Sequence, residues 1–270
     1  MLFSILIAHY NNWHYFQECY KSILNQTYKD YEIIIVDDCS TDDSYDKLVE
    51  LSKENNRIKL FRNAENKKVG FTKRRCIEEA SGEICGFLDP DDMISETALA
   101  QIIDVYKSNS NCIATYSRIK LIDQDSKEIG NFMLTKDISN KSNLFFNINF
   151  EVAHFFTFKK EVYIKTEGIN SKLIIAEDQD LYLKLFEQGT FHFIDQYLYK
   201  YRLHSSGISQ NKEKTEQQKK DWHNVILNAC NRRNITHLYG KKLEEIDNLP
   251  HYIYQKENSF FNKLKRKFGW

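Results

Sequence analysis

The amino-acid sequence predicts an α/β fold with a mostly parallel central sheet. In the first half of the chain, short apolar segments alternate with segments of helical periodicity. Polar residues follow each apolar segment directly. The composition, with 41% hydrophobic and 28% charged residues, is that of an ordinary globular protein and not of a disordered one.

Strands and helices are expected to alternate up to residue 107. The apolar segments predict strands at 3–8, 31–38, 57–61 and 83–89. Segments of helical period predict helices at 13–26, 40–51, 71–80 and 94–107. Strands separated by helices imply a parallel sheet with right-handed crossovers, and ligands bind such sheets at the carboxyl ends of the strands. The polar loops after the four strands are therefore the expected binding edge.

The pattern changes from residue 112 onward. Further strands are expected at 112–122 and up to 133 around a turn at 123–127, at 151–158 and at 190–204. A helix is expected at 177–189, and the charged residues after 209 are predicted to be helical. These changes divide the chain into three regions, 1–118, 119–209 and 210–270.

Charge and cysteine usage restrict the partners and the compartment. The formal net charge is zero, which indicates no nucleic-acid partner. The six cysteines include no C-x-x-C pair, so a zinc cluster is disfavoured and a reducing compartment, the cytoplasm, is expected. The apolar N-terminal segment lacks the basic region and cleavage site of a signal peptide, and we interpret it as a buried first strand.

Three aspartates follow the fourth predicted strand in the segment Asp89-Pro90-Asp91-Asp92. Carboxylates two residues apart on a stiff turn can direct one oxygen toward a divalent cation and another toward a hydroxyl. Mg²⁺ and Mn²⁺ tolerate one or two protein carboxylates when phosphates supply the other ligands. The alternative is an acidic N-cap for the helix predicted near Ile94.

Asp37 and Asp38 end the second predicted strand. A carboxylate at this position can accept hydrogen bonds from a base N–H or from ribose hydroxyls. The alternative is that Asp38, Ser40 or Thr41 caps the following helix. Both interpretations stay open at the level of sequence.

Lys73 and Arg74 belong to a basic segment, 67–75, that leads into a helix. Basic side chains at a helix N-terminus form an anion site suited to a diphosphate. The alternative is a solvated basic face.

Glu177-Asp178 precedes an amphipathic helix, where a carboxylate can serve either as a general base or as an N-cap. His204 follows the last predicted strand and can bind a metal or a phosphate, although a lone histidine is more often structural.

Four segments resemble one family in their order along the chain. They are SILIAHYNN with SILNQTYKDYEIIIVDDCSTDDS, then ASGEICGFLDPDD, AEDQDLYLKL and YRLHSSGIS. Together they closely resemble family 2 glycosyltransferases of the bacterial inverting type. The resemblance implies the glycosyltransferase-A fold, with a Rossmann-like, mostly parallel central sheet flanked by helices and a helical C-terminal extension.

The resemblance also implies roles for the candidate residues. It implies that Asp38 contacts the nucleobase of a UDP-sugar and that Asp178 is the catalytic base. It implies that Asp89 and Asp91 form the D-x-D donor site, with Asp91 as a metal ligand near His204. The other donor-binding candidates are His9, Lys73 and Arg74, and the acceptor-binding candidates are His154 and Glu177.

The sequence departs from the family pattern in one place. The family often has an arginine-asparagine pair before the A-S-G segment, where this chain reads Lys73-Arg74-Arg75. Which of the three side chains contacts the nucleotide is therefore left open. The Q-x-x-R-W motif of processive synthases is absent, which favours the addition of a single sugar.

The implied function is inverting transfer of one sugar from a UDP-sugar to a hydroxyl of a glycan or lipid-linked glycan in cell-surface polysaccharide synthesis, with Mn²⁺ or Mg²⁺ as cofactor. Region 1–118 is then the nucleotide-sugar-binding subdomain, 119–209 the acceptor-binding and catalytic-base subdomain, and 210–270 the helical extension. Two alternatives are a non-catalytic sugar- or nucleotide-binding protein of the same fold and a Mg²⁺-dependent phosphatase. The phosphatase class needs threonine or valine where this chain has Met93.

The segment 256–270 predicts peripheral contact with an anionic membrane. Phe260, Phe261, Leu264 and Phe268 fall within one arc of a helical wheel, and basic residues surround them. This pattern predicts a place at the inner face of the plasma membrane. The alternative is packing of this face on the catalytic domain.

Overall fold

The computed structural model describes residues 1–138, 142–205 and 215–259 of the protein. One nine-stranded sheet in this part of the chain contains β1 (Phe3–His9), β2 (Tyr31–Asp37), β3 (Ile58–Arg62), β4 (Ile84–Phe87), β5 (Met93–Ile94), β6 (Cys112–Ile122), β7 (Glu128–Phe132), β8 (Thr157–Lys159) and β9 (Thr190–Arg202). The strands lie in the order β3-β2-β1-β4-β8-β6-β9-β5, and β7 pairs with β6.

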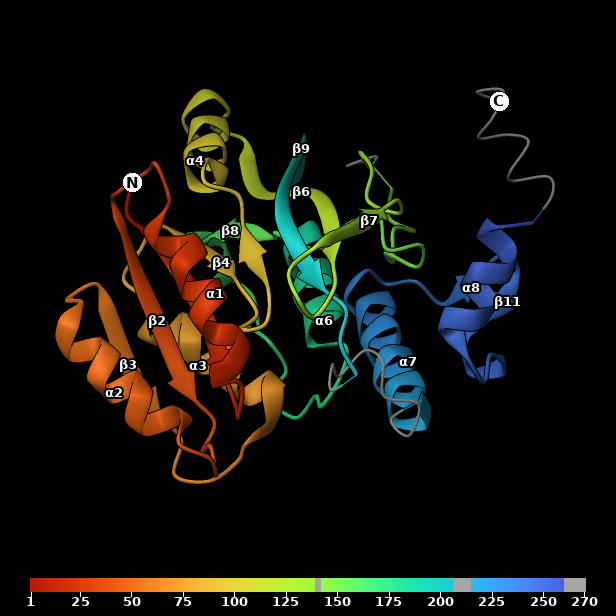
Figure 1. Ribbon diagram of the computed structural model, residues 1–270. Coiled ribbons are helices and arrows are strands. Elements are labelled where there is room, and N and C mark those ends of the chain that lie inside the picture. Colours follow the sequence, from red (N-terminus) through yellow and green to blue (C-terminus); the bar gives the residue numbers. More distant parts are fainter. Residues whose placement is uncertain (139–141, 206–214, 260–270) are drawn as a thin grey trace.

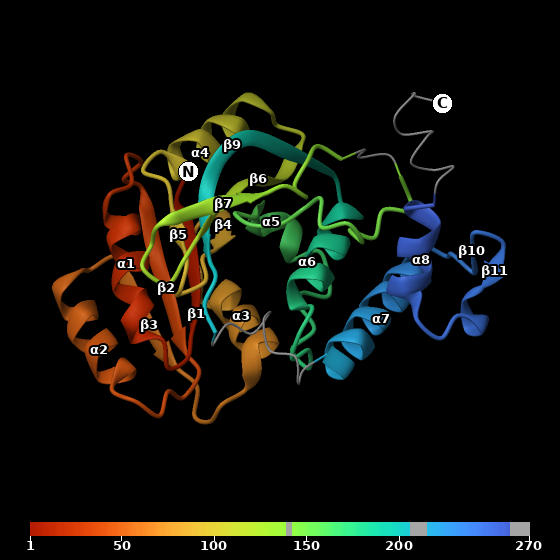
Figure 2. The same cartoon turned by 45° about the vertical axis from the view of Figure 1, so that its right-hand side comes forward.

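Helices lie on both faces of this sheet and to one side of it. They are α1 (Trp13–Leu24), α2 (Ser44–Glu54), α3 (Lys68–Glu79), α4 (Ala98–Ser108), α5 (Lys160–Tyr163), α6 (Glu177–Phe186), α7 (Thr215–Arg232) and α8 (Leu249–Glu257). In Figure 1, α1 lies in front of the first strands and α3 behind them, whereas α7 and α8 stand to one side. Figure 2 shows the same separation of α7 and α8 from the N-terminal strands.

The N-terminal half of the sheet is parallel, as predicted. β3, β2, β1 and β4 are parallel neighbours, so their carboxyl ends share one edge. β6 and β9 form a further parallel pair, whereas β8, β5 and β7 run antiparallel to their neighbours. The α/β prediction is therefore confirmed, with a mixed second half.

Two predicted elements differ from the structure. The helix expected from residue 94 begins at Ala98, because Met93–Ile94 pair with β9 as a short strand. The strand expected at 151–158 is wrong for residues 151–156. The Asn147 side chain donates to the Val152 carbonyl at 2.8 Å and accepts from the Val152 amide at 2.9 Å. It thereby occupies the backbone groups that a strand would pair.

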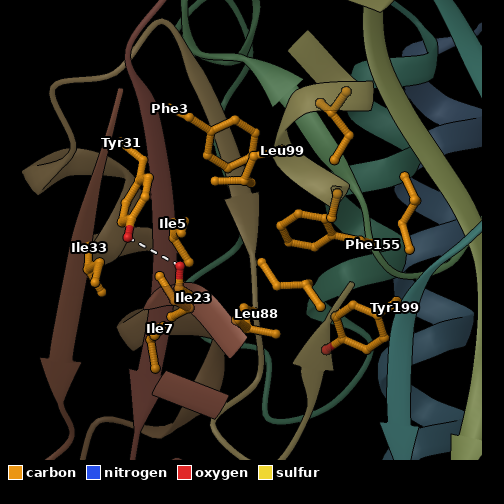
Figure 3. Packing of buried hydrophobic residues seen from close by; sticks show 14 of the residues in the cluster. Phe3, Ile5, Ile7, Ile23, Tyr31, Ile33, Leu88, Leu99, Phe155 and Tyr199 are labelled. Carbon is orange, nitrogen blue, oxygen red and sulfur yellow. Dashed lines mark hydrogen bonds between the residues drawn. The ribbon is translucent and has the colours of Figure 1, made fainter. Parts of the chain in front are cut away.

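β1 and β2 are buried on both faces of the sheet, and alternate residues of each strand point in opposite directions. Ile5, Ile7, Ile33 and Ile35 pack with α1, α2 and α4 in a first core cluster, part of which Figure 3 shows. The residues between them pack with α3, α5 and α6 in a second cluster, and these are Leu6, Ile34 and Val36. Such a strand reads as a continuous apolar run, which is why these strands were clear in the sequence.

The C-terminal segment packs on α6. A third core cluster joins Leu183 of α6 to Ile226 of α7 and Ile253 of α8. Arg232 and Arg233 both bind the carboxylate of Glu187, directly after α6. A short hairpin of β10 (His237–Leu238) and β11 (Lys241–Lys242) and a 3₁₀ turn, η3 (Leu243–Glu245), connect α7 to α8. In the described ranges, no helix has both the length and the apolar character that a bilayer crossing requires. The division at 118 and 209 stays a prediction.

We predict that Gly70→Ala destabilises the fold. A Cβ atom at Gly70 would lie 2.6 Å from the Leu173 carbonyl oxygen and 3.0 Å from that of Asn170, so α3 and this loop would have to separate. Overpacking of this kind costs about 1–3 kcal/mol. Urea unfolding measures the loss. Gly130→Ala is the control, because a Cβ there meets nothing within 4 Å. Equal stabilities of the two variants would contradict the prediction.

Candidate active site

Charged side chains from three separate elements meet at the carboxyl edge of the parallel strands. Lys73 lies on α3, Asp89 follows β4, and Glu177 and Asp178 begin α6. The Lys73 Nζ atom lies 2.9 Å from Glu177 Oε1 and 2.9 Å from Asp178 Oδ1. It lies 3.5 Å from Asp89 Oδ1. Because only 2% of Lys73 is exposed, a buried ammonium joins the D-x-D segment to the start of α6.

Burial and charge both act on the pKa values of this cluster. Burial acts to lower the pKa of Lys73, but the charges of Asp178, Asp89 and Glu177 hold it well above its usual value. Burial raises the pKa of Glu177 to about 7, with Asp178 acting in the same direction and Lys73 opposing both.

Asp178 does not act as the N-cap of α6. The cap position is Ala176, which has a left-handed backbone (φ 67°) and makes no side-chain cap hydrogen bond. Only glycine and asparagine adopt this conformation readily, so a strained residue directly precedes the two acids. The Asp178 carboxylate binds Lys73 instead. Of the two interpretations of Asp178, general base and N-cap, the structure therefore does not support the N-cap.

His154 faces the same cluster from the loop before β8. Its Nε2 atom lies 3.8 Å from Asp178 Oδ2 and 3.9 Å from Asp89 Oδ2. Its ring stacks on Tyr199 with a centroid separation of 5.1 Å and an interplanar angle of 17°. Stacking restrains the ring beside the two carboxylates, at distances longer than a direct hydrogen bond.

Asp91 pairs with His204. The Asp91 Oδ2 and His204 Nε2 atoms are 2.8 Å apart, and the Tyr15 ring lies 4.7 Å from the His204 ring. The two candidate metal ligands, Asp91 and His204, are therefore in direct contact. A carboxylate oxygen and an imidazole nitrogen together offer two ligand atoms to one cation.

Arg202 and Asp92 hold the aspartate turn in place. The fully buried Arg202 guanidinium donates to the Asp91 carbonyl at 2.8 Å and to Glu18 Oε2 at 2.6 Å. Asp92, also buried, accepts from the Tyr199 hydroxyl at 2.6 Å and from the Arg202 amide at 2.8 Å. Burial raises the pKa of Asp92 well above its usual value, and Asp91 acts in the same direction. Since α4 begins at residue 98, none of these acids caps it.

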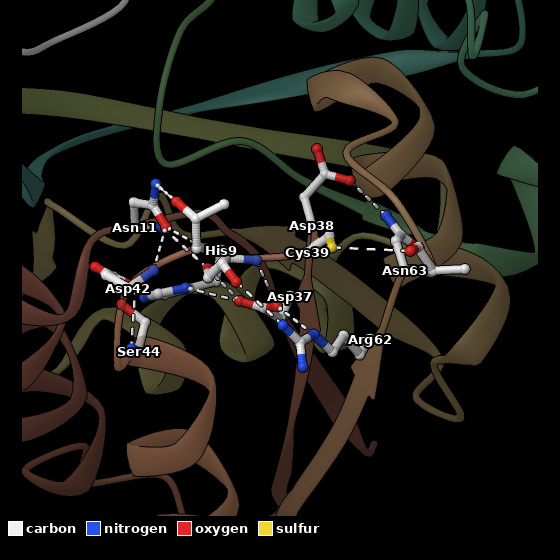
Figure 4. Close-up of polar contacts among 12 residues, drawn as sticks. His9, Asn11, Asp37, Asp38, Cys39, Asp42, Ser44, Arg62 and Asn63 are labelled. Atoms are coloured by element: carbon white, nitrogen blue, oxygen red, sulfur yellow. Dashed lines mark hydrogen bonds and ion pairs between the residues drawn. The ribbon is translucent and has the colours of Figure 1, made fainter.

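Asp38 caps a helix, but not the one that follows it in sequence. Its Oδ1 atom accepts from the Asn63 amide at 2.7 Å and from the Lys67 backbone N–H at 2.8 Å. Its Oδ2 atom accepts from the Lys68 backbone N–H at 2.9 Å. These are donors at the start of α3, and Figure 4 shows Asp38 beside Asn63. Asn63 carried no motif signal, because its role depends on a contact between two loops.

His9 lies behind this site, fully buried beside Asp37. Its Nδ1 atom is 3.5 Å from Asp37 Oδ1, and Arg62 Nε approaches the other oxygen to 3.4 Å (Figure 4). Burial acts to raise the pKa of Asp37, yet its contacts with His9 and Ser40 hold it below its usual value. The predicted donor contact of His9 stays a prediction.

The three basic residues of the open assignment point in different directions. Lys73 lies in the acid cluster. Arg74 donates to the carbonyls of Glu167 and Ile169 at 3.3 and 3.2 Å, in the segment before α6. Arg75 donates to Asn63 Oδ1 at 2.8 Å and so supports the partner of Asp38. Consecutive residues of a helix point about 100° apart, so the three side chains leave α3 on different sides.

Comparison with known proteins shows the family and the fold of this chain. The model described as "Glycosyl transferase family 2" matches residues 4–166, which is more than half of the chain. The chain therefore belongs to glycosyl transferase family 2.

Three known proteins illustrate the relationship. Hyaluronan synthase of Pasteurella multocida is 28% identical over 263 residues, which cover 97% of this chain and 26% of the synthase. The chain thus spans about a quarter of that relative's length. The crystal structure of S. aureus TarS 1-349 in complex with UDP-GlcNAc has a TM-score of 0.69 at 19% identity, covering 99% of this chain and 77% of that one. The mannosyltransferase PcManGT from Pyrobaculum calidifontis, in complex with GDP-Man and Mn²⁺, has a TM-score of 0.64 at 14% identity, covering 96% and 70%. The glycosyltransferase-A fold is confirmed.

We predict that Glu177→Gln changes the pH dependence of stability. The folded-state pKa of Glu177, about 7, lies above the ordinary value of about 4.3. Its protonation therefore stabilises the fold at low pH, and this contribution is lost as the pH rises through 7. From pH 5.5 to pH 8, the unfolding free energy of wild type should therefore fall by about 2 kcal/mol more than that of Glu177→Gln.

Urea unfolding at the two pH values measures this difference. Glu161→Gln, at an exposed position of α5, is the control. A difference between Glu177→Gln and wild type that is the same at both pH values would refute the assignment.

Proposed function

We propose that the protein is an inverting, metal-dependent glycosyltransferase that moves one sugar from a UDP-sugar to a hydroxyl of a glycan or lipid-linked glycan in cell-surface polysaccharide synthesis. One observation carries the proposal. Asp178 and Asp89, from motifs far apart in the sequence, bind the same buried ammonium and so belong to one site. Membership of family 2 supports the general activity.

The nucleotide is proposed to bind at the loops after β1, β2 and β3. Asp38 keeps acceptor capacity on Oδ2 for a base N–H, because a carboxylate offers about four lone-pair sites and three donors are present. His9 and Arg74 are proposed to support donor binding indirectly. His9 would do so through Asp37, and Arg74 through the segment before α6 that it holds. The solved relatives hold UDP-GlcNAc in one case and GDP-Man in the other. The uridine preference is therefore part of the proposal.

Asp91 and His204 fit a divalent cation. In the described part of the chain, no three histidine, cysteine, aspartate or glutamate side chains form a metal site. Mn²⁺ and Mg²⁺ need only one or two protein ligands when phosphate oxygens supply the rest, and the adjacent oxygen and nitrogen atoms of this pair meet that need. When bound, the cation would neutralise charge on the departing diphosphate.

Asp178 is proposed to be the base. Its Oδ1 atom binds Lys73, whereas Oδ2 faces His154 across 3.8 Å, where an acceptor hydroxyl can approach. Asp178 takes the hydroxyl proton while the acceptor oxygen attacks the anomeric carbon from the face opposite the diphosphate. The bond from that carbon to the diphosphate oxygen breaks, UDP leaves, and the configuration is inverted. Positive charge grows on the sugar ring in such a step, and the nearby carboxylates stabilise it. His154 and Glu177 flank Asp178 and are proposed to bind the acceptor.

A cytoplasmic location at the inner face of the plasma membrane belongs to the same proposal. It rests on the basic amphipathic pattern at 256–270, of which residues 260–270 lie outside the described residues.

Family membership disfavours the phosphatase alternative. A non-catalytic protein that binds nucleotide sugars is the remaining alternative, and UDP-sugar binding without turnover would identify it.

We predict that Asp178→Asn abolishes most turnover while leaving donor binding intact. Asparagine keeps the shape and can still accept from Lys73, but it cannot take a proton. The rate of UDP release from a UDP-sugar panel with oligosaccharide acceptors should fall by ~10²–10⁴-fold. UDP affinity, measured by calorimetry, should stay within about threefold of wild type. Asp104→Asn, an exposed aspartate of α4, is the control. Near-normal turnover by Asp178→Asn would remove it from the role of base.

We predict that Asp91→Asn weakens metal-assisted nucleotide binding. In wild type, Mn²⁺ should tighten UDP binding, because Asp91 and His204 would hold the cation and its charge would attract the diphosphate. In Asp91→Asn this gain should fall by about tenfold, whereas binding of UDP without metal should be unchanged. Calorimetry with and without Mn²⁺ measures both quantities. An undiminished Mn²⁺ effect in the variant would show that Asp91 is not a ligand.

A further inference from the structure

The charges of the acid cluster do not balance. Among the described residues, the carboxylates of Asp89, Glu177 and Asp178 all contact the single ammonium of Lys73. The titratable groups that face one another here are Lys73, Asp89, His154, Glu177, Asp178 and Tyr182. Every carboxylate of the cluster therefore depends on the same cation.

Lys73 is poorly placed to bind a donor. An ammonium has three N–H donors, and two of them make 2.9 Å hydrogen bonds to Glu177 and Asp178. The third carboxylate, that of Asp89, lies 3.5 Å away, and the ammonium also lies over the Phe87 ring at 5.4 Å. With 2% of the residue exposed, a phosphate would have to displace these contacts to reach it.

The same contacts orient Asp178. Lys73 occupies Oδ1, so the carboxylate plane is fixed and Oδ2 is directed toward His154, 3.8 Å away. The Asp178 side chain is 24% exposed, so a ligand can reach this carboxylate, whose Oδ2 atom does not bind Lys73. A general base needs one oxygen within reach of the acceptor hydroxyl and a geometry that does not change between turnovers.

We propose that Lys73 is a positioning residue for the base and not a ligand of the donor. Its ammonium holds the Asp178 carboxylate through Oδ1 and presents Oδ2 to the acceptor. This inference rests on the proposed function, because it concerns Asp178 acting as the base. On this proposal, Lys73 contributes to the rate of turnover and not to the affinity for the nucleotide.

Comparison of kcat with nucleotide affinity tests this role. Lys73→Met should lower kcat by ~10²-fold or more, whereas the affinity for UDP with Mn²⁺ should stay within about threefold. Lys73→Arg keeps the charge and should recover part of kcat. Lys107→Met, at an exposed position of α4, is the matched control and should change none of these quantities.

The opposite pattern would overturn the proposal. A Lys73→Met variant that binds UDP with Mn²⁺ at least tenfold more weakly but keeps kcat at saturating donor would make Lys73 a donor ligand. Thermal unfolding identifies a variant that fails to fold, in which case Lys73→Gln and Lys73→Arg carry the same comparison.

A second measurement needs no turnover. Carbon-13 NMR of labelled glutamate side chains follows the titration of Glu177, identified by its loss in Glu177→Gln. Removal of Lys73 should raise the Glu177 midpoint by ~1–3 pH units, because the opposing cation is gone. An unchanged midpoint would refute the electrostatic role of Lys73. If the wild-type protein transfers no sugar, but the Glu177 midpoint shifts as expected when Lys73 is removed, the result counts against the proposed function alone.

Discussion

A charged side chain leaves water only when opposite charges or hydrogen bonds surround it. Lys73 meets this condition by drawing α3, the turn after β4 and the start of α6 together. This contact helps to hold the start of α6 against the sheet, and Gly70 allows α3 to approach the backbone of the loop before α6. The strained Ala176 is the cost of turning the chain so that two consecutive acids both face the ammonium.

Arg202 applies the same principle on the other side of the aspartate turn. Its buried guanidinium connects β9 to α1 through Glu18 and to the loop after β6 through Ser126. It also holds the Asp91 carbonyl. Asp89 and Asp91 are thus anchored to different buried cations, and the turn between them has little freedom. A divalent ion and a sugar hydroxyl can be bound with precision only on such a fixed turn.

The sequence was informative where function and periodicity coincide. The parallel strands were predictable because they are buried on both faces, and the acids were predictable because they stand at strand and helix ends. Residues 151–156 were not, because the side chain of Asn147 competes with strand pairing. Asp38 could be identified as a cap or a ligand, but not as the cap of α3, since that contact spans about thirty residues. Likewise, only the phase of α3 reveals that Lys73, and not Arg74, meets the acids.

The packing of α6 has a consequence for exchanging segments among related chains. Leu181 and Leu185, on one side of this helix, pack in the second core cluster. Leu183, on another side, packs in the third. The C-terminal helices therefore supply part of the wall behind the two acids that begin α6. A chimaera joined after β9 would inherit a mismatched wall unless the facing residues of α7 and α8 came from the same parent, so modular recombination at that point is physically disfavoured.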